Sequence, residues 1–209
     1  MLNVYRLSYI RNRKLLIMTW PTAIHESPIQ ALNIPFSVFL SSLPFDKDVV
    51  KPAVSFNYSM ESDEFSGIPD LTISFESPRT AREEIPFIAE IAFSQNPSEL
   101  LEKLKAEVAS HPEIVMVMMV TILEEPPYRA PSDRSNTWET LRQSPSLTPF
   151  DFAPSDDEER QANLRVVVGD HTWCCLTSIE YRLWIWHEGP INLSRNDSDC
   201  KAHGVRCRF

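Results

Sequence analysis

The chain has 209 residues, 43% of them hydrophobic, which suffices for one ordinary domain with a real core. Its formal net charge of −9 argues against a general polyanion-binding protein, because such proteins carry a basic face. Only four glycines occur, and they lie far apart. This excludes the glycine-clustered loops that hold nucleotide phosphates.

The first 24 residues carry Arg6, Arg11, Arg13 and Lys14 and no acidic residue. Such a stretch is typical of an organellar presequence or of a poorly ordered extension ahead of the core, and we expect the extension. No apolar run reaches about 18 residues, so we expect no membrane contact through a spanning helix. The four cysteines are late and unevenly spaced, which predicts an intracellular protein, cytoplasmic or nuclear, with an organellar location left open.

Residues 25–125 predict a helix, three strands, a second helix and a fourth strand. Ser27-Pro28 predicts the start of a short helix that ends near Asn33. Alternation predicts the first two strands, and an apolar run predicts a third strand buried on both faces. These strands are expected over residues 54–59, 70–75 and 87–94.

Asn96-Pro97-Ser98-Glu99 predicts a capped helix start, with a proline in the first turn. The helix is expected to end near Ser110, before His111-Pro112. The apolar run 113–123 then predicts a central strand. A strand, a helix and a strand over this length imply a right-handed parallel crossover.

Residues 126–162 are rich in proline and serine and predict a loop or a disordered insertion. Residues 163–209 predict an appended C-terminal β segment and a tail. Trp184 and Trp186 share one face of its last strand. This aromatic strand is a candidate homodimer interface, and the alternatives are packing in the core and a surface on which bases stack.

Two carboxylates, Asp70 and Glu90, fall on neighbouring predicted strands. Glu90 is flanked by Ile88 and Ala92 on its own face, so we expect it to be buried, and a buried charge needs a partner or a metal. Two carboxylates with a carbonyl group and water suit Mg²⁺ or Mn²⁺. The alternative for Asp70 is a residue that only caps a turn.

Pro69-Asp70, the spacing to Glu90 and the order of the core elements resemble the PD-(D/E)XK, restriction-endonuclease-like nuclease superfamily. The resemblance covers about residues 25–125. It implies an α/β fold with an α-β-β-β-α-β mixed sheet, a metal-dependent nuclease that acts on nucleic acid, and Asp70 and Glu90 as catalytic metal ligands. The stretch 89–95, with Pro126-Pro127-Tyr128, is also similar to uncharacterised fungal proteins of that fold.

The sequence departs from this motif at Ala92, where the superfamily has a lysine. Lys103 and Lys105 on the following helix are candidates for the missing catalytic lysine, and Gln95 is an uncharged candidate. The alternative is that both lysines are solvated, because Lys103 is spaced to form surface ion pairs along the helix. Glu26 is a possible third acid.

Two functions therefore remain open for this sequence. The first is a divalent-metal-dependent phosphodiesterase, a nuclease. The second is an inactive nuclease-fold protein that acts as a binding or interaction module, which Ala92 and the acidic charge favour. A zinc site is a weaker candidate, and its ligands are Cys200, His203 and Cys207 with Cys174 or Cys175.

Overall fold

The computed structural model describes residues 6–19, 22–93, 96–143, 165–168, 170–186 and 191–193. The chain divides into two compact units. One unit comprises Met1–Thr121 and Tyr181–Gly204, and the other comprises Ile122–Glu180 and Val205–Phe209. None of the described helices is long and apolar enough to cross a membrane.

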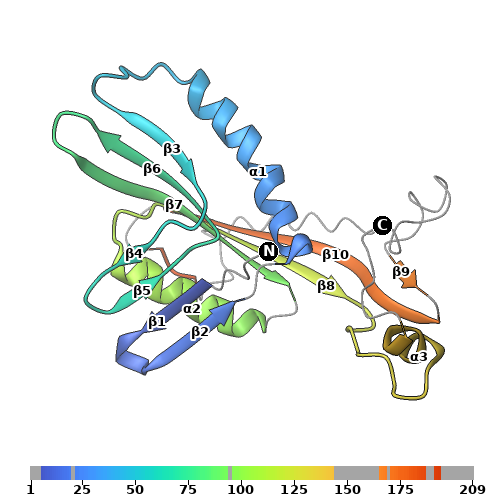
Figure 1. The fold of residues 1–209 in the computed structure, drawn as a ribbon. Coiled ribbons are helices and arrows are strands. Elements are labelled where there is room, and N and C mark those ends of the chain that lie inside the picture. The colour runs from blue at the N-terminus through green and yellow to red at the C-terminus, as the bar shows by residue number, and fades with distance from the viewer. Residues whose placement is uncertain are drawn as a thin grey trace. The chain divides into compact units, whose positions relative to one another are not determined.

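A six-stranded sheet with the order β3-β6-β7-β8-β10-β9 organises the protein (Figure 1). The chain is α/β and its sheet is mixed: β3, β6 and β7 are antiparallel neighbours, and Figure 1 draws β7 and β8 in the same direction. The elements that build the core are α1 (Ala23–Ser42), β3 (Lys51–Ser55), β6 (Leu71–Ser77), β7 (Arg82–Phe93), α2 (Pro97–Ser110) and β8 (Met116–Glu124).

The register of β6 against β7 positions the two predicted acids. Leu71 pairs with Ala89 and Thr72 pairs with Ile88, and the register shifts between Ile73 and Phe75. Asp70 directly precedes β6, so it lies beside Glu90 in β7. The prediction that Asp70 and Glu90 lie on neighbouring strands is therefore confirmed.

The helix α1 is longer than its predicted range. It begins four residues earlier because Thr22 caps it: the Thr22 hydroxyl accepts a hydrogen bond from the backbone N–H of His25 at 3.2 Å. Pro28 and Pro35 both lie inside the helix. The prediction that Pro28 opens the helix was wrong, because the cap is Thr22 and Pro28 lies inside the helix.

The N-terminal stretch is part of the first unit, which corrects the predicted extension. β1 (Arg6–Ile10) and β2 (Leu15–Thr19) form a hairpin around a 3-10 turn (Arg11–Arg13). The hairpin joins β5 (Phe65–Gly67) and β4 (Met60–Glu61) in a second sheet with the order β2-β1-β5-β4. Alternation buries Arg6, Ser8 and Ile10 and exposes Leu7 and Tyr9.

The helix α2 matches its prediction. Asn96 caps it, since its side-chain oxygen accepts a hydrogen bond from the Ser98 N–H at 3.0 Å. α2 packs against β7 and β5, while α1 packs against β3 and β7, and Figure 1 shows β7 between the two helices. The apolar core includes Ile88 and Ala92 of β7, Leu104 of α2, Val117 of β8 and Trp184 of β10.

The second unit contains a helix where the sequence predicted only a loop. α3 spans Asn136–Gln143, and the backbone N–H of Thr137 bonds the Asp170 carboxylate at 3.0 Å. β9 (Arg165–Val168) and β10 (His171–Ile185) lie where the sequence predicted a β segment, and they form an antiparallel pair with a register shift between Thr172 and Cys174. The remainder of the predicted insertion, residues 144–162, and most of the tail lie outside the described residues.

Candidate functional site

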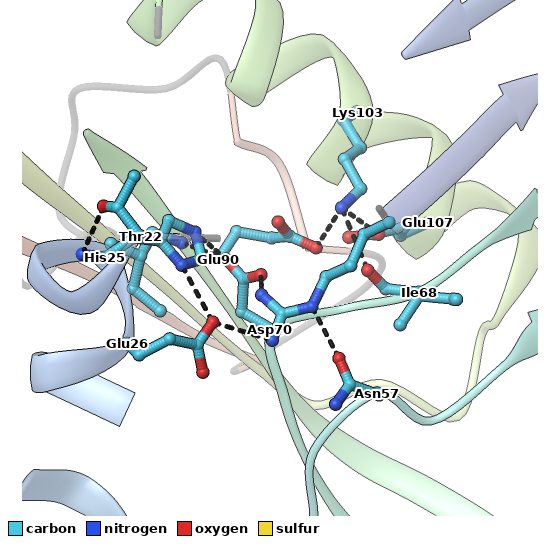
Figure 2. Close-up of polar contacts among 11 residues, drawn as sticks. Thr22, His25, Glu26, Asn57, Ile68, Asp70, Glu90, Lys103 and Glu107 are labelled. Carbon is cyan, nitrogen blue, oxygen red and sulfur yellow. Dashed lines mark hydrogen bonds and ion pairs between the residues drawn. The ribbon is translucent and has the colours of Figure 1, made fainter. Parts of the chain in front are cut away.

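Asp70 and Glu90 lie in a buried cluster of charged side chains. Each of these two residues is 2% exposed. Figure 2 shows them between side chains from α1 and side chains from α2. We call this group the ionic cluster, and its members are Arg6, His25, Glu26, Asp70, Glu90, Lys103 and Glu107.

Both oxygens of the Asp70 carboxylate are held by groups of the protein. Nη1 of Arg6 donates to Oδ1, and the backbone N–H of Ile91 donates to Oδ2 at 2.7 Å. Nε2 of His25 lies 3.1 Å from the same Oδ2. The remaining donors of Arg6 bond Asn57 Oδ1 at 2.6 Å and Glu26 Oε1 at 3.0 Å. Asp70 therefore connects β6 and β7 to the β1–β2 hairpin and to α1. Its role is more than that of a residue that caps a turn.

The environment stabilises the charged forms of Asp70 and His25. Burial raises the pKa of Asp70, but the adjacent His25 side chain and the charges of Lys103 and Arg6 outweigh it and hold this pKa below its usual value. Burial lowers the pKa of His25, and the adjacent Asp70 carboxylate more than compensates, so this pKa lies above its usual value. When His25 is protonated, the two side chains form an ion pair, with 3.1 Å between His25 Nε2 and Asp70 Oδ2.

Lys103 reaches Glu90 from α2. Its ammonium group lies 2.6 Å from Glu90 Oε1 and donates to the Ile68 carbonyl oxygen at 3.2 Å. Lys103 is 3% exposed, so the interpretation of Lys103 as a solvated surface lysine was wrong. The structure does not bring Lys105 to the acids, because Lys105 pairs with Glu102 at 2.8 Å.

Glu107 is a member of the cluster that was not among the predicted site residues. It is fully buried, and Oε1 lies 3.7 Å from the Lys103 ammonium. Neither Glu107 oxygen has a hydrogen-bond partner among the described residues. The available signal was spacing: the buried positions of α2 repeat as Leu100, Lys103, Leu104 and Glu107, the pattern of one helix face.

Glu90 and Glu107 both resist ionisation. Burial and the charges of Glu107 and Asp70 raise the pKa of Glu90 well above its usual value, although Lys103 opposes this shift. Burial likewise raises the pKa of Glu107, against the effect of Lys103. The four carboxylates of the cluster face three cationic side chains. This excess of carboxylates in a buried place adds to the cost of ionising Glu90 and Glu107.

Arg6 and His25 were also missed as partners of Asp70. Both contacts join segments that lie far apart in the chain. No local sequence pattern around Arg6 or His25 predicts a contact with Asp70. Glu26, the predicted third acid, does belong to the cluster, where it accepts a bond from Arg6 and has 30% of its side chain exposed. Ala92 packs in the core with 1% exposure, so position 92 is filled by apolar packing.

The acids as arranged do not fit the expected Mg²⁺ or Mn²⁺ ion between Asp70 and Glu90. Arg6, His25 and the Ile91 N–H already take both Asp70 oxygens, and an ion there would have to displace a buried cation. Within the described part of the chain, no three His, Cys, Asp or Glu side chains are arranged to hold a metal. We therefore derive no reaction step through a metal at this pair.

The other predicted candidates do not join the cluster. Trp184 is buried in the core, whereas Trp186 is 52% exposed. Cys174 and Cys175 are free thiols of β10, in the second unit. The remaining members of the weak zinc candidate, Cys200, His203 and Cys207, lie outside the described residues, as does Gln95.

Comparisons with known proteins add no assignment to this geometry. A scan against protein-family models, a search of curated proteins and a search of solved structures each found no match. The function of the site is therefore argued from its own residues.

Proposed function

We propose that the chain is a protein-interaction module of restriction-endonuclease-like fold, in which protein cations have replaced the catalytic metal. The order α1, β3, β6, β7, α2, β8 supports this fold, with Asp70 at the start of β6 and Glu90 within β7. Two short strands, β4 and β5, are inserted between β3 and β6, and β9 and β10 extend the sheet.

The state of Asp70 carries the proposal. A metal nuclease needs carboxylate oxygens free for an ion and a route by which a phosphodiester reaches them. Here both Asp70 oxygens have protein partners. Asp70, Glu90 and Lys103 are each at most 3% exposed. This arrangement favours a structural role for the ionic cluster.

The surface supports binding to another protein. The outward face of the β1–β2 hairpin places Leu7 opposite Met18 and Tyr9 opposite Leu16. These four side chains are between 38% and 59% exposed. Contiguous exposed apolar side chains are typical of protein contacts, and the charge of −9 disfavours nucleic acid as the partner.

A nuclease is the second candidate, and one contact favours it. Lys103 Nζ lies 2.6 Å from Glu90 Oε1, so α2 supplies an ammonium group beside the acid, as the missing motif lysine would. In this alternative Asp70 and Glu90 would hold Mg²⁺, which would polarise the phosphodiester. Arg6 would first have to leave Asp70.

A cleavage assay separates the two candidates. Wild-type protein and Glu90→Gln are incubated with labelled single- and double-stranded DNA and RNA, with Mg²⁺ or Mn²⁺. We expect no cleavage by the wild type above the level of Glu90→Gln. Metal-dependent cleavage that disappears in Glu90→Gln would establish the nuclease and reject the inactive module.

The predicted homodimer through the C-terminal aromatic strand remains a proposal. Trp186, directly after β10, is the exposed aromatic residue of that end, whereas Trp184 belongs to the core. Sedimentation velocity of wild type and Trp186→Ser over a range of concentrations tests it. A dimer that Trp186→Ser weakens supports this interface, and a strictly monomeric wild type rejects it.

A further inference from the structure

The ammonium group of Lys103 lies among oxygen atoms in the way that a bound cation would. Its neighbours are the Ile68 carbonyl oxygen at 3.2 Å, Glu90 Oε1 at 2.6 Å and Glu107 Oε1 at 3.7 Å. Figure 2 shows these three oxygens around Nζ. Carboxylate and backbone carbonyl oxygens are the ligands that Mg²⁺ and Mn²⁺ take in proteins.

Glu107 provides a second and independent indication of a cation site. It is 0% exposed, and neither of its carboxylate oxygens has a hydrogen-bond partner in the described residues. A buried carboxylate without donors is costly unless a cation or a proton compensates it. The Lys103 ammonium is the nearest cation, and at 3.7 Å it does not satisfy Glu107 by hydrogen bonding.

The charges of the ionic cluster also leave room for a cation of higher charge. When His25 is protonated, its four carboxylates (Glu26, Asp70, Glu90 and Glu107) face three singly charged groups, Arg6, His25 and Lys103. With a divalent ion in place of the Lys103 ammonium, the positive and negative charges would be equal. Both the donor atoms and the charge of the cluster therefore indicate a divalent cation.

We propose that Lys103 occupies a latent divalent-cation site built by Glu90, Glu107 and the Ile68 carbonyl oxygen, and that this site binds Mn²⁺ or Mg²⁺ once the ammonium group is removed. Unlike the pair predicted from the sequence, this site uses Glu107 and leaves Asp70 to Arg6 and His25. The inference goes beyond the proposed function, because it concerns which cation the cluster accepts. It does not depend on whether the protein has a binding partner.

Metal binding to full-length variants tests the proposal. Lys103→Ala and Lys103→Gln are titrated with Mn²⁺, and free Mn²⁺ is followed by electron paramagnetic resonance. We expect one saturable site per chain in both variants, at least tenfold tighter than any binding to the wild type. Lys105→Ala is the matched control, since Lys105 lies on the same helix and pairs with Glu102, and it should behave as the wild type.

A double variant tests whether Glu107 is a ligand of the ion, and thermal unfolding shows whether the Lys103 variants keep the fold. Lys103→Ala with Glu107→Gln should lose the gained site. Mn²⁺ should raise the unfolding midpoint of Lys103→Ala but not that of the wild type, because a ligand that binds only the folded state stabilises it. If Lys103→Ala is unfolded without metal, Mn²⁺ should restore its far-UV circular dichroism.

The outcomes that overturn the proposal are equally definite. Folded Lys103 variants without a saturable Mn²⁺ site, or an unfolded Lys103→Ala that Mn²⁺ does not restore, would show that no cation site lies there. Binding that survives Glu107→Gln would place the ion elsewhere. The cleavage assay is separate: cleavage by the wild type would reject the inactive module and leave the Mn²⁺ result on the variants unaffected.

Discussion

At the scale of single residues, the ionic cluster depends on every partner being present. Arg6 is 3% exposed and its guanidinium group bonds Asp70, Glu26 and Asn57. Removing one member of a buried ion pair leaves an uncompensated charge, which costs more than the pair itself contributes. The arginines of the hairpin allow this to be measured with an internal control.

Arg6→Met is expected to lower the free energy of unfolding by about 3–5 kcal/mol, because Asp70 keeps its charge in a buried place. Arg13→Met is the control, since Arg13 pairs with Glu102 while 54% of its side chain is exposed. It should cost no more than about 1 kcal/mol. Urea unfolding followed by circular dichroism gives both values. Equal effects of the two substitutions would show that Arg6 does not hold a buried carboxylate.

His25 should make stability depend on pH in a defined direction. Because its pKa is raised in the folded state, the folded protein binds the proton more tightly than the unfolded chain. This contribution is complete below the unfolded value of about 6.5 and is lost as pH rises through the folded value.

We therefore expect the difference in unfolding free energy between wild type and His25→Gln to shrink as pH rises from about 6 to about 8. Urea unfolding of the two proteins across this range measures the difference. A difference that grows with pH, or that does not change, would contradict the ion pair with Asp70.

At the scale of elements, local sequence signals predicted the middle of the chain well. Alternation and the buried character of residues 87–94 gave the pairing of Asp70 with Glu90, and the Asn96 cap gave the start of α2. The burial of Lys103 was not predicted, because a helical Lys between Glu99 and Glu107 also fits a solvated face. The contact with Glu90, which lies on β7, is what makes Lys103 a buried residue rather than a solvated one.

The cap of α2 offers a test at this scale. Asn96→Ala is expected to cost about 1 kcal/mol, because the Ser98 N–H loses its acceptor. Asn96→Asp keeps an acceptor at the cap and favours the positive end of the helix, so it should be close to wild type. Thermal unfolding of both variants checks this. A stable Asn96→Ala would mean that packing alone defines the start of α2.

At the scale of the whole molecule, the N-terminal stretch shows where sequence reasoning failed. Residues 6–19 form a local hairpin, but their basic residues also fit an extension, and β5, the strand that pairs with β1 in the sheet, lies far along the chain. The same distance hides the contact of Arg6 with Asp70. The contact of Arg6 with Asp70 joins remote segments and is encoded by no local pattern, and it determines the nature of the site.

In the ionic cluster, protein cations rather than a metal neutralise Asp70 and Glu90. A crystal structure of wild-type protein grown with excess Mn²⁺, with an anomalous difference map, tests this most directly. We expect no manganese bound to Asp70 or Glu90, with Arg6 and Lys103 still in contact with these acids. A manganese ion coordinated by both carboxylates, with Arg6 displaced, would contradict it.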